Sequence, residues 1–446
     1  MKSFRLLPLF VAVSAALALP VGAQSLVELY ESARGFDASY QSAKSQYDAT
    51  LARADQAKAA ILPTANLGVG ASRTRQESLP DGGTNTERTY DTQSAKVSAS
   101  QPLYRPANWA SYRQGLKQVD LAQAQLSSAD QDLIVRVSQA YFDVLASQDS
   151  LTFVQAQKAA VGEQLASAKR NFEVGTSTIT DTREAQARYD LVIAQEIAAE
   201  NDLRVKRIAL DQLVGKSDAQ PQPLAQPPAL PALVPDDVNV WVQQSETEHP
   251  AIKQTQVALD VAQLETQKAQ AGHKPTLDLT ADYGATRYPD GNPSSSLPTV
   301  ASRSNAASIG LVFNLPLFAG FSTQNRIRET LALEEKARND LEGARRSVAQ
   351  GTRTAYFGVL SGQGQVKALE AAEASSQSAL DANKLGYQVG VRINIDVLNS
   401  QSQLFDTKAR LAKARYDVLV GGLRLRQANG TLKADDLQSV NALLAK

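Results

Sequence analysis

The sequence predicts an α+β protein built from two copies of one unit, each with a β-hairpin followed by long α-helices. Three observations indicate this fold class. The two halves of the chain resemble each other, two pairs of short segments alternate apolar and polar residues, and two long tracts lack proline. A repeat predicts two similar units, alternation predicts strands, and apolar residues at three- and four-residue steps predict helices.

The repeat is clearest in residues 140–145 (AYFDVL) and 355–360 (AYFGVL), which stand 215 positions apart. At the same offset, residues 172–175 (FEVG) meet residues 387–390 (YQVG). Motifs that keep one offset across the chain indicate a duplicated structural unit.

The duplication divides the chain into segments. We predict a first repeat over 24–215 and a second over 238–430, with a Pro-rich linker over 216–237 between them and a tail over 431–446. Residues 1–23 begin with basic side chains, continue with an apolar run and end in small residues. This pattern predicts a secretory signal peptide, so we expect the protein to be exported.

Strict alternation marks one β-hairpin in each unit, at about 63–103 and about 275–317. In the second hairpin, Leu277 and Leu279 flank Asp278, and the pattern continues along the segment. Strands of ~10 residues with one apolar face are typical of outer-membrane proteins. They are also typical of a soluble antiparallel sheet with one solvent-exposed face, so alternation alone does not decide between the two interpretations.

A long helical tract follows each hairpin. The first, over 109–172, contains no proline, and its apolar stripe is rich in Ala. At ~1.5 Å per residue, such a helix approaches ~100 Å and is expected to pack as a coiled coil. Gly175 and Gly390 are expected to end the two tracts. Return helices to Gly215 and Gly430 would then complete a helical hairpin in each unit.

The composition argues against several function classes. Lys plus Arg number 46 and Asp plus Glu number 46, so the chain lacks the basic excess expected for nucleic-acid binding. Beyond residue 23, no apolar run reaches the ~20 residues of a transmembrane helix. We find no phosphate loop, nucleophile elbow or metal-ligand spacing, and we predict no catalytic residue, metal or cofactor.

With these features together, the chain resembles the TolC-like outer membrane factors. The resemblance covers nearly all of the chain after residue 23, and its most specific string is 386–398 (GYQVGVRINIDVL). It implies a homotrimer in outer-membrane lipid, with four strands per protomer in a shared twelve-stranded barrel. A periplasmic α-helical barrel with a small mixed equatorial domain would continue it. The implied function is a passive exit duct, not an enzyme, that works with a periplasmic adaptor and an RND or ABC pump in efflux or type I secretion.

The resemblance also implies a periplasmic constriction formed by acidic side chains. In the family, two aspartates of each protomer form two acidic rings in the trimer. Asp396 stands at the position of one of these aspartates, whereas Asn399 stands at the position of the second. One charge ring is therefore expected to be missing, which would weaken the constriction as a cation trap. A carboxylate at a helix start is also favoured by the helix dipole alone, and this structural reading of Asp396 remains open.

Further family positions imply links that hold the duct closed. The matching residues here are Thr180, Asp181, Tyr387, Arg392 and Arg415. An Arg392–Asp181 pair at a wet surface would contribute only ~0–1 kcal/mol, but several links in three protomers would add up. The hairpin tips at Gly175 and Gly390 are the implied contacts for the adaptor.

Two other classes remain as alternatives. A periplasmic coiled-coil scaffold or adaptor without a pore would also contain long helices, but one helical hairpin between β-rich domains is expected there. An exported hydrolase would need a catalytic constellation, which the sequence does not contain. The two strand hairpins favour the duct.

Overall fold

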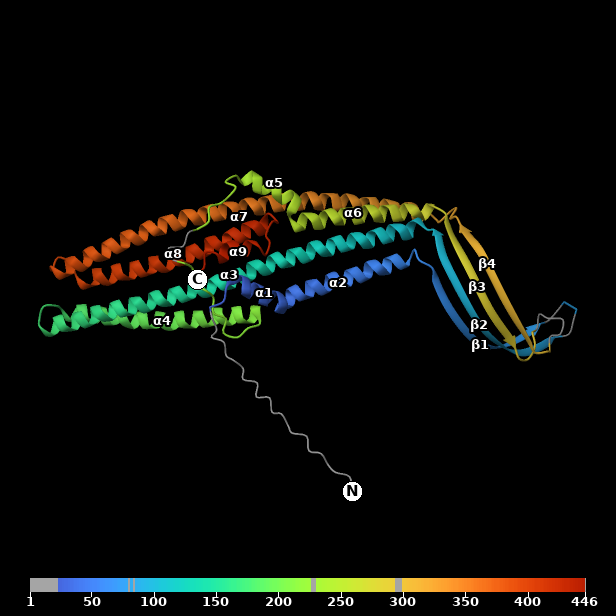
Figure 1. Cartoon of the computed structure of the whole chain (residues 1–446), viewed down its shortest axis with the longest axis horizontal. Helices are drawn as coiled ribbons and strands as arrows, with labels where there is room; N and C mark the ends of the chain where they lie inside the picture. The colour runs from blue at the N-terminus through green and yellow to red at the C-terminus, as the bar shows by residue number, and fades with distance from the viewer. Residues whose placement is uncertain (1–22, 79–80, 83–84, 226–229, 293–298, 446) are drawn as a thin grey trace, which may run out of the picture.

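The computed structural model describes residues 23–78, 81–82, 85–225, 230–292 and 299–445. All of the predicted signal peptide except Ala23 lies outside these ranges. Figure 1 shows an elongated molecule, with a β-sheet at one end and long helices that run from the sheet to the opposite end. None of the helices within the described ranges is long and apolar enough to cross a membrane.

The sheet combines the two predicted hairpins. Its strands are β1 (Thr64–Ser78), β2 (Thr86–Tyr104), β3 (Thr276–Tyr288) and β4 (Ser302–Asn314). They lie in sequence order, all pairs are antiparallel, and β2 pairs with β3 to join the two halves of the chain. β1 and β4 are therefore the edge strands, and each leaves one row of backbone groups without a partner in the protomer.

The register gives the sheet one apolar face. Leu67, Val97, Tyr283 and Ala307 form one row across the four strands. Apolar side chains on this face are strongly exposed in the protomer, with Leu67 at 70% and Ile309 at 78%. An apolar face of this size requires a covering surface, because exposure of such residues to water is unfavourable.

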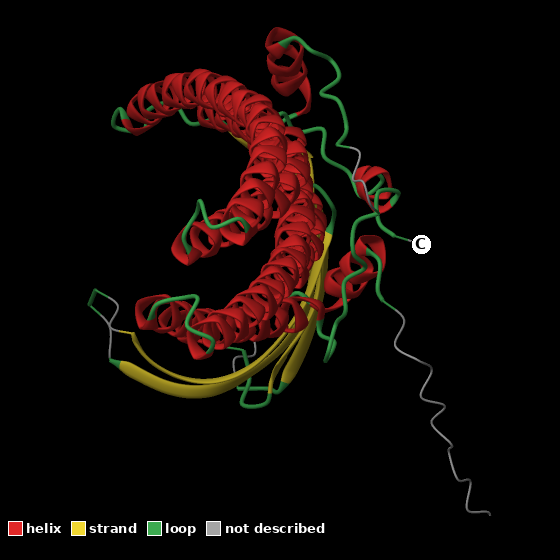
Figure 2. Ribbon diagram, turned by 90° about the vertical axis from the view of Figure 1, so that its left-hand side faces the viewer, coloured by secondary structure: helices red, strands yellow, loops and turns green. Residues whose placement is uncertain are grey.

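Two helices of nearly equal length form the body of the molecule. α3 (Pro106–Glu173) has 68 residues and α7 (Ser322–Gln388) has 67, which corresponds to ~100 Å each. α2 (Ala38–Ala59) packs beside α3, and α6 (Pro250–Gln270) packs between α3 and α7. Seen along the molecule, the helices follow a curved wall (Figure 2).

The return helices complete the two helical hairpins. α4 (Ile179–Val214) packs along α3, and α8 (Asn394–Ala428) packs along both α7 and α3. Both hairpins turn at the end of the molecule that is far from the sheet (Figure 1). The contact of α8 with α3 therefore joins the second hairpin to the first.

A mixed belt lies at the middle of the helices. It contains α1 (Leu26–Phe36), α5 (Val238–Glu248) and α9 (Asp436–Asn441), together with the linker and the tail. The linker bridges to Gln24 through Pro221 and to Leu444 through Leu224. The largest buried cluster lies here, and it includes Tyr141 and Phe142 of the repeated motif.

Candidate functional site at the helical hairpin tips

The first tip is a closed turn in which Asp181 has a structural role. Gly175 has φ +79°, and the amide of Thr176 donates to the Asn171 carbonyl at 2.8 Å. α4 then begins with a capping box: the Asp181 amide donates to Thr178 Oγ1 at 3.2 Å, and the Thr178 amide donates to Asp181 Oδ2 at 3.0 Å. This arrangement satisfies backbone donors that a helix start otherwise leaves unpaired.

The cap also changes the acidity of Asp181. Partial burial of the carboxylate would raise its pKa, but hydrogen bonds from the Thr178 amide, the Thr178 hydroxyl and the Ser177 hydroxyl outweigh burial and lower the pKa. The Asp181 side chain is therefore held as a charged acceptor within its own turn.

The second tip has the same turn without the cap. Gly390 has φ +80°, and the Val391 amide donates to the Gly386 carbonyl at 2.9 Å. Ile393 stands where the first copy has Thr178, so α8 has no side-chain N-cap. In the described chain, the Asp396 carboxylate accepts no capping hydrogen bond from the backbone at the start of α8, whereas the Asp181 carboxylate accepts one at the start of α4. The Asp396 carboxylate therefore does not have the capping role of Asp181.

The nearest charge to Asp396 is Arg392. Arg392 Nη1 lies 3.7 Å from Asp396 Oδ2, and both side chains are partly exposed. The expected Arg392–Asp181 ion pair is not present in the described protomer, because Arg392 lies against Asp396 and the Asp181 carboxylate is occupied by the cap. Arg392 therefore reduces the negative charge at Asp396.

The other expected link residues lie at different places. Tyr387 accepts a hydrogen bond from Asn171 Nδ2 at 3.3 Å, which joins α7 to α3. Arg415 pairs with Glu370 at 2.9 Å, so it connects α8 to α7 inside the second hairpin and lies away from the tip. Thr180 is exposed in the first turn of α4, and the protomer's described contacts give its side chain no hydrogen-bond partner.

Two residues that the sequence did not single out, Arg188 and Asn394, also make contacts between the hairpins. Arg188 Nη2, on α4, donates to Asn399 Oδ1, on α8, at 2.7 Å. Asn394, which is fully buried, accepts from Gln164 Nε2 and donates to the Asp181 carbonyl at 3.3 Å. These contacts connect the first hairpin to the start of α8.

An apolar contact supports the same junction. Leu398 of α8 is fully buried and packs against Val161 and Leu165 of α3 and Val192 of α4. Leu398 lies one residue from Asn399, so the polar link and the apolar contact act on the same turn of α8. Any motion of α8 away from α3 and α4 must break both.

The chain matches a known protein family once in each of its two repeats. The family described as outer membrane efflux protein matches residues 29–216 and again residues 241–431, one match in each half. The chain belongs to the outer membrane efflux protein family. This is a family of transport channels, so the predicted outer-membrane exit duct, its location and its fold class with four strands per protomer are confirmed.

Individual relatives agree over nearly the whole chain. The chain is 34% identical to the outer membrane protein TolC of Vibrio cholerae, over 98% of both chains. It is 31% identical to the alkaline protease secretion protein AprF of Pseudomonas aeruginosa, over 94% of this chain and 87% of that protein. The crystal structure of the outer membrane protein VceC from Vibrio cholerae superposes with a TM-score of 0.74 at 19% identity, over 91% of this chain and 96% of that one.

Proposed function

We propose that three copies of this chain form a closed exit duct across the outer membrane and the periplasm. The free edges of β1 and β4 support this proposal, because pairing them between protomers closes the sheet into a twelve-stranded barrel. Lipid offers no hydrogen bonds to an open sheet edge, so closure by assembly satisfies both edges. The exposed apolar face that contains Leu67 and Ile309 would then contact lipid.

The observation that carries the gate proposal is the set of contacts between the two hairpins at one end of the molecule. We place the periplasmic gate at the start of α8, with Asp396 and Asn399 at the constriction. The Arg188–Asn399 bond and the buried Asn394 hold α8 against the first hairpin, and the Asn171–Tyr387 bond joins α7 to α3. Thr180, Asp181, Arg392 and Arg415 are proposed as further closing residues, and the first two would contact a neighbouring protomer.

The proposed partners follow from the position of the tips. The α3–α4 and α7–α8 turns, which contain Gly175 and Gly390, lie at the end of the molecule far from the sheet (Figure 1). They would therefore meet a periplasmic adaptor and, through it, an inner-membrane pump of the RND or ABC type. AprF is named for the secretion of a protease, and other relatives are named for efflux. We propose the same two uses, efflux or type I secretion, for this duct, without catalysis by the chain.

Reconstitution in planar bilayers tests the proposal. The protein purified from outer membranes is expected to run as a trimer and to produce discrete ion-conducting steps of low conductance. A stable monomer that produces no steps would instead fit the scaffold alternative.

The Asp396→Asn variant is expected to weaken block by trivalent cations added on the periplasmic side by about tenfold or more. Three Asp396 carboxylates around one axis attract a trivalent ion, and each pair of opposite unit charges at ~4 Å contributes ~1 kcal/mol even in water. The matched control is Asp406→Asn, an exposed carboxylate farther along α8 that pairs with Arg410. Equal block of the wild type and Asp396→Asn would place the constriction elsewhere.

A further inference from the structure

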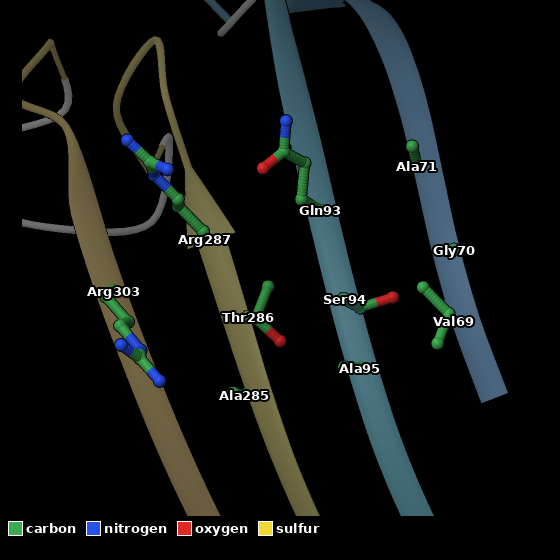
Figure 3. Close-up of a pocket in the computed structure, with 10 residues that line it drawn as sticks. All are labelled: Val69, Gly70, Ala71, Gln93, Ser94, Ala95, Ala285, Thr286, Arg287 and Arg303. Carbon is green, nitrogen blue, oxygen red and sulfur yellow. The ribbon is translucent and has the colours of Figure 1, made fainter. Parts of the chain in front are cut away.

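Arg287 on β3 and Arg303 on β4 lie directly opposite each other near the end of the sheet that is far from the helices. Figure 3 shows the two side chains on neighbouring strands. Both are exposed, and in the described part of the sheet neither has an acidic side chain within ion-pair distance. The acidic residue nearest in sequence, Asp290, accepts a hydrogen bond at Oδ2 from the Asp91 amide at 3.1 Å.

This pair differs from two other arginines of the sheet, Arg73 and Arg75. Arg73 is paired with Asp91 at 2.6 Å, and Arg75 is paired with Glu87. Like charges directly opposite each other on antiparallel strands destabilise a sheet. An anion from outside the chain would balance the Arg287–Arg303 pair.

The register shows which face the arginines occupy. Side chains two residues apart on a strand share a face, so Arg303 shares the face of Ile309, Leu311 and Phe313. Those three side chains are 64 to 78% exposed in the protomer and form the apolar face of the sheet. Arg287, opposite Arg303, shares this face, so both point toward lipid if the apolar face does.

The distance along the strand gives the depth of the arginines in the membrane. Arg303 lies ten residues before Phe313 in β4, which places the two residues ~34 Å apart along the strand. With a strand tilt of ~45°, this is ~24 Å along the membrane normal, close to the ~25 Å height of the apolar band in outer-membrane barrels. Phe313 lies at the helical, periplasmic end. Arg287 and Arg303 therefore lie at the headgroup level of the outer leaflet.

We propose that Arg287 and Arg303 bind the phosphate groups of an outer-leaflet lipid headgroup. A guanidinium presents parallel N–H donors that match two phosphate oxygens, and the pair supplies two positive charges at the depth where lipid phosphates lie. Such a lipid would neutralise the like-charge pair and fix the barrel relative to the outer leaflet. This inference rests on the proposed barrel.

The test uses the purified trimer and lipid A as the probe. Binding is measured by native mass spectrometry with lipid A that carries both phosphates, with lipid A from which the phosphates have been removed, and with inorganic phosphate. The wild type is expected to bind the phosphorylated lipid about tenfold or more tightly than the dephosphorylated lipid. The Arg287→Gln/Arg303→Gln variant is expected to lose this preference.

Two further variants control the experiment. Arg345→Gln removes an exposed, unpaired arginine from the described part of α7, outside the sheet, and should bind lipid A as the wild type does. Arg287→Lys/Arg303→Lys keeps the positive charges but removes the planar guanidinium groups. This variant should retain part of the preference for phosphorylated lipid A, even if the Gln variant folds poorly.

Three results would overturn the inference. Equal lipid A binding by wild type and a trimeric Gln variant would show that the arginines are not the site. Equal binding of the dephosphorylated lipid would exclude phosphate recognition. Full competition by inorganic phosphate at millimolar concentration would identify a free-phosphate site and not a lipid site. A wild-type protein that is not a trimer would instead contradict the barrel itself, which native mass spectrometry detects separately.

Discussion

Gly430→Ala is expected to destabilise the protein by about 3 kcal/mol or more. Gly430 follows α8 with φ +82°, where an L side chain costs ~1–2 kcal/mol. A Cβ at this position would also overlap backbone atoms of the α5–α6 junction, including His249 N at 2.6 Å. Backbone atoms of a helix junction cannot rotate away, so the overpacking adds a second cost of ~1–3 kcal/mol.

Alanine variants of two other glycines distinguish the cost of the backbone conformation from the cost of the steric overlap. Gly390→Ala places a Cβ at nearly the same φ, +80°, but with nothing within 4 Å in the protomer, so only the backbone cost of ~1–2 kcal/mol is expected. Gly215, the partner of Gly430 in the first repeat, has φ +68° and faces the Phe36 ring, which is a side chain and can move. Gly215→Ala should fall between the other two.

Thermal unfolding followed by the helical circular dichroism signal measures this order. The largest loss of stability is expected for Gly430→Ala, an intermediate loss for Gly215→Ala and the smallest loss for Gly390→Ala. Equal losses for all three would mean that backbone conformation alone determines the cost, and that the contact between the α8 end and the α5–α6 junction does not contribute to stability.

Arg188→Ala is expected to shift the duct toward its open state by roughly a hundredfold in population. The hydrogen bond from Arg188 to Asn399 joins the two hairpins at 2.7 Å and involves a charged donor. Because both side chains are partly exposed, we assign it about 1 kcal/mol per protomer, or about 3 kcal/mol for three protomers. A change of that size alters a closed–open ratio by roughly a hundredfold.

Single-channel recording in planar bilayers measures the effect as a larger conductance and a longer open time. The matched control is Arg183→Ala, which removes an exposed arginine from the same helix that has no ion-pair partner in the described protomer. Asn399→Asp should have the opposite effect to Arg188→Ala, because it converts the hydrogen bond into an ion pair. If Arg188→Ala conducts like Arg183→Ala, the contact is not a closing link.

The sequence predicted those parts of the fold that depend on local patterns. The turns at Gly175 and Gly390 follow from glycine's access to positive φ, and the strand hairpins follow from the period-two alternation. The pairing of β2 with β3 could not be predicted from the sequence of either hairpin alone. It depends on how the two halves pack, which is set by contacts among α3, α6 and α7.

The site was predicted less completely than the fold, for a similar reason. A Thr178–Asp181 capping box is a local pattern that the sequence does contain, and it explains why Asp181 is not free to pair with Arg392 in the protomer. The Arg188–Asn399 contact depends on the rotation of α8 against α4, which no local pattern specifies. Asn394 offered one signal, because it is polar where the first repeat has Ile179.

The central claim is that protomers assemble through the edges of their sheets, and disulfide crosslinking tests it most directly. The chain contains no cysteine, so an introduced pair reports a single contact. Ile309→Cys on β4 is combined in turn with a cysteine at each β1 position over 65–71. Oxidation in outer membranes is expected to yield a covalent trimer at one or two positions on the face of Leu67 and Val69, and little product at Asn66 or Gly68. A β1 scan that yields only monomer, or equal product on both faces, would contradict the account.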